Sequence, residues 1–340
     1  MPDSRPDSQI FKSVSADELF SVLYGRVKAC DKAIPVITGP TASGKSALAM
    51  KLAHVIGGEI VSCDAMQVYR GFDIGTAKPA PKDLVAVPHH MIDILDPCDR
   101  MSVASFTEAV TKVLASLLEQ GKKPILCGGS VQYLSALLDG LQFFGSEPDP
   151  SLRETIAREI DELGVQQSWA ILNQLDPQAA LQIAPTDRRR ISRFFELYRQ
   201  TGMTKTDHNR RSREQGPRYP FQAFWLDLTP RDALYRRIDR RVERMYQDGL
   251  PEEIRLLMEE YPQYQDCPAF RGIGYRETVR FLQEAITEEE ARALTARSTR
   301  RYAKRQQTWL RKRKDLFVLL LDRTSEDKDE TPRSERQSKG

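Results

Sequence analysis

The segment from Gly39 to Ser46 has the clearest chemical potential in this 340-residue chain. Its sequence, GPTASGKS, fits the pattern G-x-x-x-x-G-K-[ST] in full. In such a loop the glycines let backbone N–H groups point inward, the lysine reaches the terminal phosphates and the final hydroxyl suits Mg²⁺. The pattern predicts a phosphate cradle and, at Ser46, a metal ligand. The predicted cradle residues are Gly39, Thr41, Ala42, Ser43, Gly44, Lys45 and Ser46. Because such a loop recognises oxygens and charge, it does not identify the compound that carries the phosphate.

A carboxylate, Asp64, ends the apolar segment EIVSCD. At the carboxyl end of a parallel strand it would face the edge where α/β sheets bind their ligands. There it would either hold Mg²⁺ through water or take a proton from an acceptor nucleophile. A third interpretation is a helix N-cap for the residues that follow. The residue type alone leaves these three roles open.

The elements that must position these residues alternate between short apolar runs and helical patterns. Apolar runs occur at IPVIT from Ile34, at EIVSCD, around Ile92 to Leu95 and around Ile125 to Cys127, and later at QAFWLDL and DLFVLLLD. Segments with helical spacing separate them, as in SALAMKLAHVIG and SVASFTEAVTKVLASLLEQG. This alternation predicts an α/β fold, with a P-loop NTPase-like parallel sheet flanked by helices.

Composition divides the chain into four parts. Residues 1–32 are interpreted as an N-terminal extension of uncertain order, and residues 33–148 with 217–321 as the P-loop α/β core. Residues 149–216 have helical spacing and become basic, which predicts a helical insertion. Residues 322–340 contain no hydrophobic residue and are expected to be disordered.

The formal net charge of +3, from 51 basic and 48 acidic side chains, hides an uneven distribution. Residues 188–218 carry ten Lys and Arg against three acids, and residues 297–314 carry nine and no acid, on a predicted basic C-terminal helix. A small-molecule kinase has no need of two such clusters, whereas binding of a phosphate backbone does. The charge distribution therefore favours a nucleic-acid partner over an ATP-dependent kinase, which stays the alternative from another class.

Several classes of protein are excluded. No apolar run approaches the roughly 18 residues of a membrane-spanning helix, so no membrane contact is expected. The five cysteines have no metal-binding spacing and an odd count, which is typical of a reducing compartment. We expect a cytoplasmic monomer without a zinc site.

Six blocks in one order resemble a known family. They are GPTASGKSALA, VSCDAMQVYRGFDIGTAKP, PHHMIDILDP, GGSVQYLSALLDGL, FRGIGYRE and TRRYAKRQQTWLR. Over about Ile34 to Leu321 the chain resembles the tRNA dimethylallyltransferase (tRNA isopentenyltransferase) family of bacterial type. The resemblance implies transfer of a dimethylallyl group from dimethylallyl diphosphate to N6 of adenosine 37 in tRNAs that read codons beginning with U, giving N6-isopentenyladenosine. The cradle would then hold the diphosphate leaving group with Mg²⁺. Prenylation of free adenine nucleotides is a related alternative, against which the basic insertion argues.

The resemblance also assigns roles to residues. It implies that Asp64 is the general base, that Ser130 contacts the diphosphate where the family usually has Thr, and that Arg241 lies near the diphosphate, with Arg237 one helical turn away as the alternative. Candidates for stacking on the extruded adenine are Tyr69, Tyr275, Arg305 and Trp309. The implied contacts with the tRNA anticodon stem-loop are Asp64, Ala65, Met66, Gln67, Arg153, Arg189, Arg190, Ile191, Ser192, Arg193, Arg271, Gly272, Ile273, Gly274, Tyr275, Arg276, Lys304, Arg305, Gln306, Gln307, Thr308, Trp309, Leu310 and Arg311.

Overall fold

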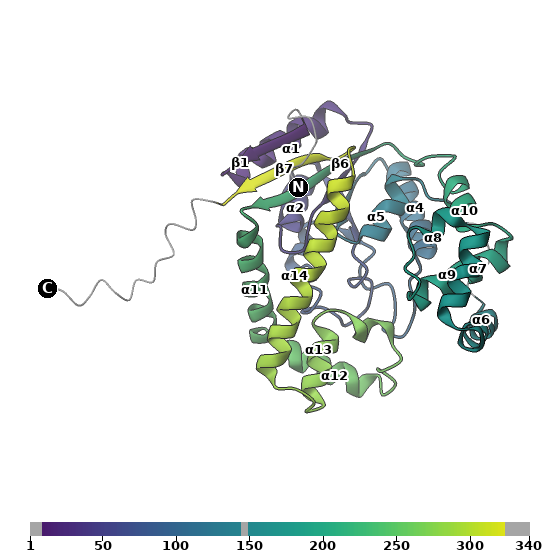
Figure 1. The fold of residues 1–340 in the computed structure, drawn as a ribbon. Coiled ribbons are helices and arrows are strands. Elements are labelled where there is room, and N and C mark those ends of the chain that lie inside the picture. The colour runs from purple at the N-terminus through teal and green to yellow at the C-terminus, as the bar shows by residue number, and fades with distance from the viewer. Residues whose placement is uncertain (1–8, 144–148, 324–340) are drawn as a thin grey trace. The chain divides into compact units, whose positions relative to one another are not determined.

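The structure, a computed structural model, describes residues 9–143 and 149–323 (Figure 1). Residues 324–340, most of the expected disordered tail, lie outside the described residues. In chain order the elements are β1 (Ile10–Ser13), α1 (Ala16–Ala29), β2 (Ile34–Thr38), α2 (Lys45–Ile56), β3 (Gly58–Cys63), α3 (Pro81–Ala86), β4 (His89–His90), α4 (Val103–Glu119), β5 (Lys123–Gly128), α5 (Val131–Leu138), α6 (Pro150–Leu163), α7 (Val165–Leu175), α8 (Pro177–Ala180), α9 (Arg188–Thr201), α10 (Lys205–Arg211), β6 (Phe221–Thr229), α11 (Arg231–Gln247), α12 (Leu250–Glu260), the 3-10 helix η2 (Pro268–Arg271), α13 (Tyr275–Leu282), α14 (Glu288–Lys312) and β7 (Phe317–Asp322).

One parallel sheet organises the larger part of the chain. Its seven strands lie in the order β1-β7-β6-β2-β5-β3-β4. β2, which leads into the P-loop, pairs with β6 on one side and β5 on the other. Since all pairs are parallel, the carboxyl ends of β2, β5 and β3 meet at one edge of the sheet. The predicted α/β fold with a parallel sheet is confirmed.

The N-terminal segment belongs to this sheet. β1 pairs with β7, and Leu19, Leu23 and Val27 of α1 are buried in the core. The extension of uncertain order expected over residues 1–32 is, in its described part, an ordered piece of the sheet and its core. A four-residue edge strand and one short amphipathic helix give too little periodic signal to be recognised as part of a sheet.

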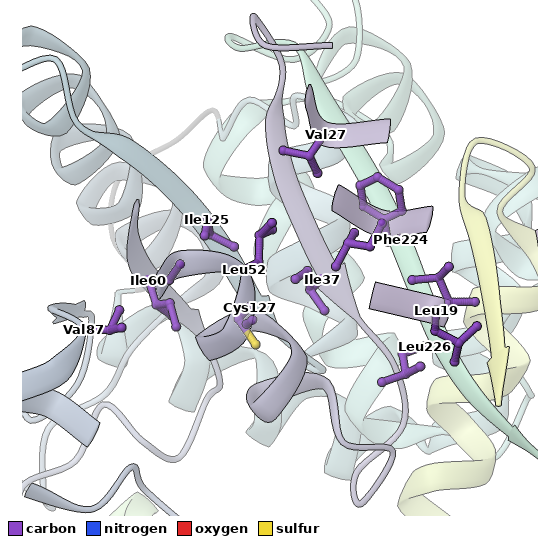
Figure 2. Close-up of a cluster of buried hydrophobic side chains, with 14 of the residues drawn as sticks. Leu19, Val27, Ile37, Leu52, Ile60, Val87, Ile125, Cys127, Phe224 and Leu226 are labelled. Atoms are coloured by element: carbon purple, nitrogen blue, oxygen red, sulfur yellow. The ribbon is translucent and has the colours of Figure 1, made fainter. Parts of the chain in front are cut away.

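The main core fills the space between α1, α2 and the sheet. Figure 2 shows Leu19 and Leu52 from these helices near Ile37, Ile125 and Phe224 of the strands. The apolar positions of α2 face the sheet because they recur with helical spacing. Burial of this face fixes α2 directly after the P-loop, with its N-terminus at the carboxyl edge of the sheet.

Two local expectations need correction. The strand expected around Ile92 to Leu95 is the two-residue β4, and the chain leaves the extended conformation at Met91 and Asp93, which both have positive φ (64° and 55°). The structure also joins Cys98 and Cys267 in a disulfide, 169 positions apart, although the spacing and odd count of the cysteines are typical of a reducing compartment. No sequence signal relates two cysteines that far apart, because only the fold brings η2 to residue 98.

The chain divides into two compact units, Met1–Leu134 with Tyr219–Gly340 and Ser135–Arg218. Helices α6 to α10 belong to the second unit, whose core contains Ile160, Leu172 and Phe194. This unit begins earlier than the helical insertion expected at residue 149. Within the described ranges, no helix is long and apolar enough to cross a membrane.

Candidate active site

The P-loop has the backbone shape of an anion cradle. Gly44 (φ 100°) and Ala42 (φ 64°) both adopt the left-handed conformation, which Ala rarely does, and α2 begins at Lys45 immediately afterwards. The first N–H groups of a helix have no partner within it, so they point at whatever occupies the cradle. The hydroxyl of Ser43 is buried and has no hydrogen-bond partner among the described residues. A buried orphan donor beside a helix N-terminus fits a phosphate oxygen as its partner.

A cavity of about 610 Å³ opens beside this cradle at the carboxyl ends of β2, β5 and β3. The loop after β3, from Thr76 to Ala80, and helix α14 also contribute to its wall. Of the predicted site residues, those that line it are Thr41, Lys45, Ser46, Asp64, Gln67, Arg241 and Gln306. The structure thus brings together the P-loop, the carboxylate of Asp64 and the guanidinium of Arg241, which lie far apart in the sequence.

The cavity has an excess of positive charge. Removal from water lowers the pKa of both Lys45 and Arg241, while the nearby Asp64 carboxylate raises both. The wall also contains Lys78 and Asp83, so that three cations face two carboxylates and the site favours an anion. Arg241, whose Nη2 lies 3.4 Å from the Thr76 carbonyl oxygen, lines the cavity, whereas Arg237 is not among its lining residues.

Asp64 makes the cap contact that one of its three interpretations predicted. Its Oδ1 accepts hydrogen bonds from the N–H groups of Met66 (2.9 Å) and Gln67 (3.4 Å), as a cap does. The same half-buried carboxylate lines the cavity. The cap fixes the direction of the carboxylate, so that a substrate proton donor meets it in one orientation.

Ser130 is placed differently from the expectation. Its Oγ accepts the N–H of Ala65 at 2.9 Å, and the residue is buried outside the cavity lining. In this arrangement the hydroxyl ties the start of α5 to the Asp64 turn. Ser130 therefore supports the loop that carries Asp64.

Tyr302 of α14 is a cavity residue that the sequence prediction missed. Its hydroxyl hydrogen-bonds to Ser130 and Gln306, and burial raises its pKa to about 12, so it stays protonated at neutral pH. The residue lies within the block TRRYAKRQQTWLR, but its neighbours there suggested only a basic surface. The sequence prediction also missed the Thr76–Ala80 loop, since most of its side chains have no group that suggests a catalytic or binding role.

The residues expected to contact tRNA divide between surface and interior. Exposed members are Arg153, Arg189, Arg190, Arg193, Arg271, Arg276, Lys304, Arg305, Thr308 and Arg311. Buried members are Ile191, Gly274, Tyr275, Gln306, Gln307 and Leu310. Ile191, Tyr275, Gln307 and Leu310 are packed inside, and none of them lines the cavity. A continuous run along a helix covers every face of it, and these residues lie on the inner face.

On α9 the surface arginines differ in their partners. Glu196, which is buried, binds Arg153 (3.2 Å) and Arg193 (2.7 Å), and Asp187 pairs with Arg190. Arg189 is exposed and has no acidic partner among the described residues. It is thus the arginine of this helix whose charge is most available to a phosphate.

A parallel sheet with a P-loop, and a cationic cavity at its carboxyl edge, define a P-loop α/β protein built to hold a phosphate compound. The profile of one family, described as IPP transferase, matches residues 67–313. A tRNA dimethylallyltransferase of Roseiflexus sp. (strain RS-1) is 43% identical over 286 residues, covering 84% of this chain and 92% of the relative. The chain belongs to the IPP transferase family.

Solved structures agree with this assignment. The tRNA isopentenylpyrophosphate transferase of Bacillus halodurans is 34% identical with a TM-score of 0.61, covering 87% of this chain and 92% of its own. A eukaryotic dimethylallyltransferase whose structure is described as acting on tRNA is 26% identical, with a TM-score of 0.74, covering 88% and 76%.

Proposed function

We propose that this protein transfers a dimethylallyl group from dimethylallyl diphosphate to tRNA. The single observation that carries the proposal is the cationic cavity of a chain of the IPP transferase family, whose wall holds Lys45, Lys78 and Arg241 against two carboxylates. The acceptor in this proposal is N6 of adenosine 37 in tRNAs that read codons beginning with U. The enzyme would act in the cytoplasm as a monomer, where the Cys98–Cys267 pair would face a reducing environment.

The chain's own residues supply two elements of the chemistry. As the adenine N6 attacks C1 of the dimethylallyl group, a C–N bond forms, the C1–O bond breaks and the electron pair leaves with the diphosphate. Asp64 accepts the proton that N6 loses, and Lys45, Arg241 and the first N–H groups of α2 stabilise the departing charge. The ammonium of Lys45 needs no proton transfer for this role.

The donor set at the cavity fits Mg²⁺ bound mainly through the substrate. Ser46 and Asp64 line the cavity, and no group of three or more His, Cys, Asp or Glu residues that could hold a metal occurs in the described chain. Mg²⁺ commonly keeps several waters and takes substrate phosphate oxygens with one or two protein ligands. Bound there, the ion would neutralise charge on the diphosphate.

The test is a transfer reaction analysed by mass spectrometry of nucleosides. We expect the wild-type protein to add a dimethylallyl group to adenosine of an unmodified anticodon stem-loop, and to leave AMP unmodified. Asp64→Asn should lower kcat by about 10² to 10⁴ while inorganic diphosphate still binds, because the amide cannot accept the proton that N6 loses. Lys45→Ala should weaken diphosphate binding itself. Steady phosphate release from ATP without prenylation would instead indicate an NTPase.

A further inference from the structure

Gln306 links two backbone segments that meet at the cavity. Its Oε1 accepts the N–H of Thr41 in the P-loop at 2.9 Å, and its Nε2 donates to the carbonyl oxygen of Gly129 at 2.7 Å. The side chain is only 2% exposed. We propose that Gln306 is a positioning residue, which holds the P-loop in the geometry that binds the diphosphate; this inference rests on the proposed function.

The bridge requires the particular chemistry of a primary amide. One of its atoms must accept from an N–H group and the other must donate to a carbonyl group, both in a buried place where an unpaired backbone group is costly. A methyl group on Gly129 would stand 2.3 Å from Gln306 Nε2, so the glycine leaves the space that the amide fills. Gly129 and Gln306 are thus matched parts of one contact.

This contact changes the role expected for Thr41. Because its N–H group donates to Gln306, it is not directed at a phosphate. The orphan hydroxyl of Ser43 and the first N–H groups of α2 remain for the anion. Gln306 therefore acts on the diphosphate through the loop that it holds.

The neighbouring residue provides a matched control. Gln307 is equally buried, at 3% exposure, but its Nε2 donates to the Asp227 carboxylate at 2.9 and 3.1 Å and does not reach the P-loop. Both side chains belong to α14 and both make buried hydrogen bonds. Only Gln306 should affect diphosphate affinity if the proposal is right.

The experiment measures binding of inorganic diphosphate by calorimetry, together with thermal unfolding, for the wild type, Gln306→Ala and Gln307→Ala. We expect Gln306→Ala to weaken diphosphate binding about tenfold and to raise the KM for dimethylallyl diphosphate by a similar factor. Gln307→Ala should lower the melting temperature while its diphosphate affinity equals that of the wild type. Wild-type affinity in folded Gln306→Ala would overturn the positioning role. Absence of diphosphate binding in the wild type would overturn the donor site itself.

Two further variants keep the test independent of folding defects. In Gln306→Glu the carboxylate cannot donate to Gly129, but the protonated acid offers the same donor and acceptor as the amide. Its diphosphate affinity, relative to the wild type, should recover as the pH falls. Gly129→Ala should displace the amide and weaken binding like Gln306→Ala, and the double variant should be no weaker than either. Two outcomes would count against the bridge: additive losses of diphosphate affinity in the double variant, or no recovery of affinity in Gln306→Glu at low pH.

Discussion

Asp227 illustrates how a single buried carboxylate sets a pH dependence. It lies in β6, only 5% exposed, and accepts hydrogen bonds from Gln307 and from the N–H of Leu228. Burial raises its pKa from 3.8 to about 6, against the lowering effect of these hydrogen bonds. Between these two pH values the folded chain keeps a proton that the unfolded chain has lost.

This difference predicts a loss of stability as the pH rises from about 4 to 6. In that window the folded state binds more protons, so the free energy of unfolding falls with pH and the loss is complete above pH 6. We expect Asp227→Asn to remove this part of the pH dependence and to be more stable than the wild type at pH 7, by on the order of 2–3 kcal/mol.

Denaturant unfolding at pH 4, 5, 6 and 7 checks this. The difference in the free energy of unfolding between the variant and the wild type isolates the contribution of Asp227 from that of the other groups that titrate in the same range. A difference that stays constant from pH 4 to 7 would contradict the raised pKa.

For individual residues, the sequence predicted well which side chains line the cavity near a motif, and poorly which side chains make contacts with distant parts of the chain. Lys45, Ser46 and Asp64 line the cavity as expected, because a motif of eight residues and a strand end determine their surroundings. Gln306 was expected on the tRNA surface, although its amide reaches a P-loop residue 265 positions away. Nothing in the sequence near Gln306 or Tyr302 reveals such a contact, since tertiary packing alone creates it.

Among the elements, the interior strands were predictable and the edges were not. β2, β3, β5 and β6 are buried along most of their length and read as continuous apolar runs. The edge strands β1 and β4 have four and two residues, too few for a pattern. Helices α11 and α12 show apolar residues at helical spacing because one face of each is buried.

Helix α9 supports a prediction about arginines that share one element. Arg189 is exposed and without an acidic partner in the described chain, whereas its neighbour Arg188 donates to Asp161 at 2.6 Å. A partnered arginine must leave its carboxylate or share its charge before it binds a phosphate. We therefore expect Arg189→Ala to weaken binding of the anticodon stem-loop more than Arg188→Ala.

Fluorescence anisotropy with a labelled stem-loop measures the two affinities at one fixed salt concentration. The loss for Arg189→Ala should be about tenfold, as for one charge-assisted hydrogen bond. Equal losses in both variants would mean that ion pairing within the helix does not decide which arginine binds RNA.

Across the whole molecule, the placement of charge matters more than its sum. The net charge is only +3, but the outer face of α14 presents Lys304, Arg305 and Arg311 to solvent. Binding of a phosphate backbone releases counterions in proportion to the phosphates contacted, whatever the total charge of the protein. Affinity for the stem-loop should therefore fall steeply between 50 and 200 mM salt, a range chosen to show that release.

Two lysine substitutions separate placement from total charge, because each lowers the net charge by one. Lys304 lies on the exposed face of α14, whereas Lys112 lies on α4, 75% exposed and paired with Glu108. We expect Lys304→Ala to reduce the slope of log affinity against log salt by roughly 0.7 to 0.9, the contribution of one phosphate contact. Lys112→Ala should leave the slope unchanged. If both variants lowered the slope equally, the RNA would be responding to the overall charge of the protein and α14 would not be its binding surface.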